Sequence, residues 1–129
     1  VHVREEMRGL YHAALAYASN HLITLVTSSM ELLRMSGIDE PERVLDPLLH
    51  ASLDNALRIG DGALTGPVAR GDVETLKRHI TAIGDASEET QAAYVALATL
   101  TTHRAERTGL LDDEAASALL DVLSERGDR

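Results

Sequence analysis

Apolar residues in the first quarter of the chain recur at intervals of three and four, the spacing of one helix face. The repeat predicts a helix from about Arg4 to Met35, either single or two in line, and roughly 50 Å long at about 1.5 Å per residue. Such a helix either bends near Ser19 or extends beyond one small core. Gly37 suits the left-handed residue that follows a helix. The apolar positions are Leu10, Ala14, Tyr17, Ala18, Leu22, Leu25, Val26 and Leu33.

The remaining pattern predicts four more helices, separated by proline, glycine and capping residues. We expect a short turn over 41–45 and a helix over 47–59, capped by Asp46 with Pro47 in its first turn and ended by Gly60. Asp72 begins a helix that Gly84 closes, and further helices run from Ser87 to near residue 109 and over about 113–125. No segment alternates like a strand. The sequence therefore predicts an all-α bundle of five to six helices with a long first helix.

Composition narrows the class of protein. The 129 residues suffice for one helical domain over 1–129, and aromatic residues make up only 2%. A net charge of −9 disfavours nucleic acid, and no apolar run is long enough to span a membrane. Cysteine is absent and no signal peptide is visible, so we expect a cytoplasmic protein. The chain begins at Val1 without a methionine, which suggests a piece of a longer protein.

The candidate chemistry begins with histidine. None of the six histidines is spaced as a metal-ligand pair, so we expect no metal. His12 and Asn20 are eight residues apart and share one stripe of the first helix. Polar side chains in that setting indicate either a buried hydrogen bond or the wall of a groove. Asn55 lies mid-helix in "SLDN", where it either faces solvent or points to a cleft.

The segment "LTGPVARGD" combines a turn with an unexplained cation. Gly66 precedes Pro67 and should be extended, whereas a positive φ at Gly71 would suit the start of the next helix. An interhelical turn explains these residues but leaves Thr65 and Arg70 unexplained. Because arginine grips carboxylates through two parallel hydrogen bonds, we expect Arg70 to bind an acid that also faces the N-terminus of the next helix.

Three segments carry a family resemblance: "YHAALAYASNHLITL", "LLHASLDNAL" and "ALTGPVARGDVETLKRHI". Together they resemble, over roughly residues 10–105, the C-terminal helical domain of Rossmann-like proteins with domain of unknown function 2520. The resemblance implies a fold like the C-terminal domain of the 6-phosphogluconate dehydrogenase superfamily, which includes ketopantoate reductases. It also implies an N-terminal domain, absent from this chain, that holds NAD(P), with substrate in the cleft between the domains.

Site residues follow from the resemblance one by one. His12 and Asn20 match the family's polar positions on the first helix, and Thr65, Gly66, Pro67, Arg70 and Asp72 match its loop. Better-known reductases of the superfamily carry a lysine one turn before the asparagine. Here that position is Ala16, so we expect His12 to replace the lysine as proton donor.

Two main functions stay open. The first is the substrate-side domain of an NAD(P)-dependent oxidoreductase that reduces a small, ketopantoate-like keto acid. There His12 and Asn20 would be catalytic, while Asn55, Thr65, Gly66 and Arg70 would bind the carboxylate substrate. The alternative is a non-catalytic module for dimerisation or interaction, because superfamily domains often form homodimers. A small-molecule sensor with a pocket between helices is a third, weaker possibility.

Overall fold

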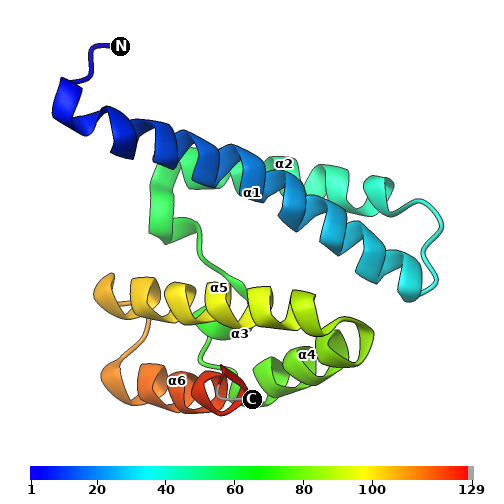
Figure 1. Ribbon diagram of the computed structural model, residues 1–129. Helices are drawn as coiled ribbons and strands as arrows, with labels where there is room; N and C mark the ends of the chain where they lie inside the picture. Colours follow the sequence, from blue (N-terminus) through cyan, green and yellow to red (C-terminus); the bar gives the residue numbers. More distant parts are fainter. Residues whose placement is uncertain (128–129) are drawn as a thin grey trace. The chain divides into compact units, whose positions relative to one another are not determined.

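The protein is all-α, as the sequence predicts. The computed structural model describes residues 1–127, and no strand occurs among them (Figure 1). No helix within these described residues has the length and apolarity needed to cross a membrane. The chain divides into two compact units, Val1–Arg43 and Val44–Arg129. The elements in order are η1 (Glu5–Met7), α1 (Arg8–Met35), α2 (Pro41–Ile59), η2 (Gly60–Ala63), α3 (Gly66–Ala69), α4 (Val73–Ala86), α5 (Glu88–Arg107) and α6 (Asp113–Gly127).

Helix α1 is one uninterrupted helix of 28 residues. Of the two possibilities that the pattern left open, a single helix is therefore confirmed. Gly37 has a φ of 95°, and the N–H of Ile38 donates to the carbonyl of Leu33 at 3.0 Å. The N–H of Gly37 reaches the carbonyl of Arg34, also at 3.0 Å. This double closure is the glycine-terminated helix end that the sequence predicts.

No residue of α1 is buried. Many of its large apolar side chains are exposed, whereas Val26, Met30, Leu32 and Leu33 are half-buried. Serine and threonine near the C-terminal half are satisfied locally, since Ser28 donates to the carbonyl of Thr24 at 2.7 Å. Exposed apolar residues that gather on one helix are a feature of interaction surfaces. The exposed apolar residues are Leu10, Tyr11, Leu15, Tyr17, Leu22, Ile23, Leu25 and Met35.

Helix α2 differs from the prediction at its start. Pro41 occupies the first helical position as expected, but no turn separates it from a second helix, and Pro47 lies inside α2. Proline keeps a helical φ and removes one backbone donor. Helix α2 continues through Pro47 without a break. The neighbouring Asp46 carboxylate pairs with the exposed His50 ring at 2.9 Å instead of capping a new helix. Gly60, with a φ of 57°, follows the end of α2 as predicted.

The core lies in the second unit, where α4 packs against α5, α5 against α6, and the short α3 against both α4 and α5 (Figure 1). Leucine, isoleucine and valine fill it, and several alanines allow the helices to approach closely. The predicted faces of α4 and α6 supply its fully buried residues Leu76, Ile80 and Leu119. The core residues are Val68, Leu76, Ile80, Ala98, Ala105, Leu111, Ala116, Leu119, Val122 and Leu123.

Polar side chains cap the helices of this unit. Asp72 accepts from the N–H of Thr75 at 3.1 Å, and Ser87 accepts from the N–H of Thr90 at 3.1 Å, so both predicted caps are confirmed. The expectation that Gly84 closes α4 is wrong, because the helix continues to Ala86. Gly84 keeps a helical backbone, and the space above it is filled by a side chain from α5.

Candidate functional site

The predicted site residues fall into two groups, one in each unit. His12 and Asn20 lie on α1, in the unit Val1–Arg43. Asn55 lies on α2, and Thr65, Gly66 and Arg70 lie in and around α3, all in the unit Val44–Arg129. The contacts of each group are described within its own unit.

His12 and Asn20 are both exposed, and neither side chain makes a hydrogen bond within residues 1–127. Of the two interpretations of this polar pair, a buried hydrogen bond therefore does not hold inside the unit. Eight residues place Asn20 roughly 80° around the helix axis from His12, within one broad stripe of the helix. The closest ring to His12 is that of Tyr11, with centroids 5.7 Å apart.

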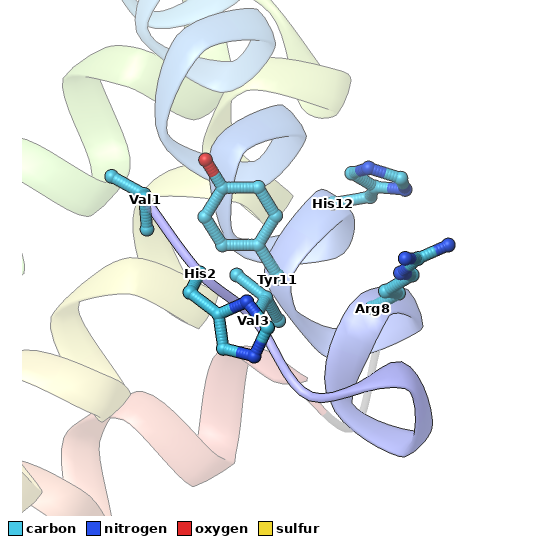
Figure 2. A pocket seen from close by; sticks show the side chains of 6 residues that line it. All are labelled: Val1, His2, Val3, Arg8, Tyr11 and His12. Carbon is cyan, nitrogen blue, oxygen red and sulfur yellow. The ribbon is translucent and has the colours of Figure 1, made fainter.

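A pocket of about 320 Å³ lies at the N-terminal end of α1 and includes His12 in its lining (Figure 2). The extended segment before η1 passes beside the first turns of the helix and forms one wall. Arg8 and His12 project from the same side of α1, one turn apart, and the phenol ring of Tyr11 stands beside them (Figure 2). The residues lining the pocket are Val1, His2, Val3, Arg8, Tyr11 and His12.

Sequence reasoning missed Arg8, Tyr11 and His2. The four-residue interval from Arg8 to His12 was visible in the sequence and places both side chains on one helix face. His2 could not be assigned, because nothing in its sequence neighbourhood shows that the chain before the helix folds back towards Tyr11 (Figure 2).

In the second unit, Thr65 and Gly66 shape the turn into α3. Thr65 is extended, with φ −145° and ψ −173°, and its hydroxyl accepts from the N–H of Gly66 at 2.7 Å. Gly66 has a φ of 88°, so the expectation that it would be extended is wrong. A side chain at this φ would be strained, which explains glycine before Pro67. Thr65 thus has a structural role as the cap of α3, which the sequence had left unexplained.

Arg70 follows α3 and presents an exposed side chain. Its backbone N–H donates to the carbonyl of Gly66 at 3.2 Å, which fixes the position of the residue. No hydrogen bond or ion pair of its guanidinium occurs within the part of the chain that the structure describes. Gly71 has a φ of 68°, as predicted for the residue before the Asp72 cap. Arg70 is therefore held at the backbone and available at the guanidinium.

Asp72 already occupies the N-terminus of α4. Its carboxylate accepts from the hydroxyl of Thr75 at 2.7 Å and from the N–H of Thr75 at 3.1 Å. These hydrogen bonds hold the pKa of Asp72 below its ordinary value, and the positive charges of Arg70 and Arg78 add to the effect. The N–H of Thr75 in the first turn of α4, which we expected to face a bound anion, therefore already has the Asp72 carboxylate as its partner.

Asn55 is engaged locally. Its side-chain oxygen accepts from the guanidinium of Arg58 at 2.9 Å, one turn along α2, and the residue is only partly exposed. This contact accounts for its amide oxygen and leaves the amide N–H₂ group for other partners.

No three histidine, aspartate or glutamate side chains gather as metal ligands anywhere in residues 1–127. The first unit presents the side chains of Arg8 and His12 on α1, and the second presents Arg70 beside Thr65 at α3. Such groups hold carboxylates or phosphates and move protons.

Fold and site together define an all-α domain with exposed, unpaired cationic side chains. Residues 1–101 match the family model described as "Domain of unknown function (DUF2520)". The chain belongs to this family. No curated protein and no solved structure matches the chain.

Proposed function

We propose that the chain is the substrate-side helical domain of an NAD(P)-dependent oxidoreductase that reduces a small keto acid, ketopantoate-like by analogy. One observation carries the proposal. The two site residues with reactive chemistry, His12 and Arg70, lie inside the family match and present exposed side chains without hydrogen-bond or ion-pair partners in the described chain. The proposal gives the domain the plan of the 6-phosphogluconate dehydrogenase superfamily and places the protein in the cytoplasm.

Each residue has one role in this proposal. Arg70 binds the substrate carboxylate through parallel N–H donors, and its exposed guanidinium supports that role. Asn20 donates to the carbonyl oxygen and orients it, and His12 gives that oxygen a proton as the carbonyl carbon gains a hydride. A nicotinamide held by a separate nucleotide-binding domain would supply the hydride. The keto acid thus becomes a hydroxy acid, and the histidine is reprotonated from solvent.

Thr65, Gly66 and Asn55 act around this centre. Thr65 and Gly66 set the backbone that carries Arg70, since the carbonyl of Gly66 holds the Arg70 N–H. The amide nitrogen of Asn55 is the group through which that residue would bind substrate, because its oxygen already accepts from Arg58.

The test is a reductase assay on the complete product of the gene that encodes this chain. We expect oxidation of NADPH or NADH with ketopantoate or another small 2-keto acid. The variant His12→Ala should lower kcat by about 100-fold or more, as loss of a positioned proton donor does. Arg70→Gln should mainly raise KM. The control is His103→Ala, an exposed histidine on α5. Full activity of His12→Ala would refute the role of His12. A wild-type protein that reduces no keto acid would refute the proposed reductase function.

A second candidate is a homodimerisation module, which the exposure of α1 favours. Leu22 and Ile23 are 44% and 60% exposed in a helix with no buried residue. In this candidate, α1 packs against a second copy of the chain. Sedimentation of the protein should then give a dimer that Leu22→Lys converts to a monomer, while the exposed-residue control Glu31→Gln stays dimeric. A monomeric wild-type protein would exclude this candidate.

A further inference from the structure

Arg8 lines a pocket without a carboxylate partner, which distinguishes it from the other arginine at this end of the chain. Arg4 pairs with the carboxylate of Glu6 at 3.6 Å. Arg8 has no carboxylate within 4.0 Å and no side-chain hydrogen bond among residues 1–127. Arg8 is one of the residues that line the 320 Å³ pocket, and its side chain projects from the same side of α1 as His12 (Figure 2). An unpaired guanidinium beside a pocket is a donor set that a planar oxyanion can satisfy.

The other polar side chains that line the pocket are also potential hydrogen-bond donors. The ring nitrogens of His12 and His2 and the hydroxyl of Tyr11 can each donate a hydrogen bond, and Tyr11 is 37% exposed. Carboxylates are absent from the lining, although Glu5 and Glu6 lie in the preceding 3₁₀ turn. The chain's net charge of −9 opposes anions in general. Because salt screens exposed charges beyond about 8 Å, the groups within the pocket decide what binds there.

We propose that the pocket formed by Arg8, His12, Tyr11 and His2 binds a small oxyanion, either the carboxylate of an organic acid or a phosphate group. Arg8 holds two oxygens of the anion, and His12 reaches it from one turn further along α1. This anion is separate from the carboxylate that Arg70 binds in the proposed function, and the inference does not depend on that function. The binding itself requires no nucleotide and no reaction, so it can be tested separately.

The pocket also has room for a small ligand. A pocket of about 320 Å³ lies at the lower end of the range of small-molecule sites, which runs from about 300 to 1,000 Å³. Inorganic phosphate and small organic acids fit within such a volume. The valines at positions 1 and 3 give one wall an apolar surface, against which a short hydrocarbon chain can lie.

The experiment is an NMR titration of the protein with two probes in separate arms, inorganic phosphate and pyruvate. The signals to follow are the ring protons of His12 and His2 and the side-chain Nε–H of Arg8. We expect saturable shifts of these signals with at least one probe, and the arm that saturates identifies the anion as phosphate or carboxylate. Histidines outside the pocket, such as His103, should not follow the same curve.

Variants make the test specific. Arg8→Gln should weaken binding by about tenfold or more, since it removes a charge-assisted bidentate contact. The matched control is Arg34→Gln, an exposed arginine in the last turn of the same helix, which should bind like the wild type. Tyr11→Phe keeps the ring and should weaken binding less than Arg8→Gln. Circular dichroism checks that each variant stays helical.

Two results would overturn the proposal. One is the absence of saturation with both probes, and the other is equal affinity in Arg8→Gln and Arg34→Gln. Neither result bears on hydride transfer, which the reductase assay measures. Conversely, an inactive gene product with a saturable, Arg8-dependent pocket would refute the reductase and leave the anion site standing.

Discussion

The side-chain amide of Gln91, on α5, donates a hydrogen bond to the backbone carbonyl of Ile80, on α4, at 2.8 Å. To reach it, the amide passes over Gly84, where an added Cβ would overlap Gln91. Helix α4 ends at Ala86 and Ser87 caps the start of α5, so this hydrogen bond links the two helices near the turn that joins them. Glycine is kept inside α4 for the close approach of a neighbouring side chain rather than to end the helix.

The pair gives a first prediction, for a double-mutant cycle. Gly84→Ala should change the free energy of unfolding by less than about 1 kcal/mol, because better helix propensity offsets the displaced hydrogen bond. In a Gln91→Ala background, the same change should stabilise the protein by about 0.5–1 kcal/mol. Urea denaturation of the four proteins measures the coupling. Equal effects of Gly84→Ala in both backgrounds would contradict the contact.

The second prediction concerns the core of the unit Val44–Arg129. Leu119 is fully buried between packed helices, so Leu119→Ala should lower the free energy of unfolding by about 2–5 kcal/mol. Leu97 is 44% exposed, and Leu97→Ala should cost less than about 1 kcal/mol. Denaturant midpoints compare the two variants. Similar losses would mean that the core is not where the structure places it.

The third prediction uses Glu106, near the end of α5. Its pKa is raised above the ordinary value by a hydrogen bond with the Asp113 carboxylate, then by burial and by the Asp113 charge. The folded state therefore favours protonated Glu106, and stability falls as pH rises from the ordinary glutamate pKa through the raised one. Glu106→Gln keeps a donor without the charge. It should raise the melting temperature at pH 7 and lose this advantage below the ordinary glutamate pKa.

The fourth prediction is the opposite case, at Asp72. Its pKa is lowered in the fold, so the ionised form contributes stability above the ordinary aspartate pKa and loses it as pH falls through the lowered one. Asp72→Ala should lower the melting temperature at pH 7 and make acid unfolding less steep. Asp85→Ala, an exposed aspartate on the same helix, is the control. An unchanged acid profile in Asp72→Ala would mean that the cap does not titrate with folding.

Local sequence determined most of the elements. Three-and-four spacing gave the helices, because one face of each must be apolar to pack, and side chains such as Asp72 and Ser87 capped them because their oxygens accept from nearby N–H groups. Gly37 and Gly71 adopt the left-handed φ that their position in the sequence predicts. These features depend on neighbours within four or five residues, so a single sequence contains what is needed to find them.

Tertiary structure decided what depends on distant neighbours. Pro47 and Gly84 both look like helix boundaries, yet both lie within helices; at Gly84 the decisive contact comes from Gln91 on another helix. Thr65 and Asn55 remain predicted substrate contacts, and the structure adds their hydrogen bonds with Gly66 and Arg58. The pocket at Arg8 needs the segment before α1 to fold back beside Tyr11. Local propensity does not encode such approaches, since side chains from elsewhere in the fold create them.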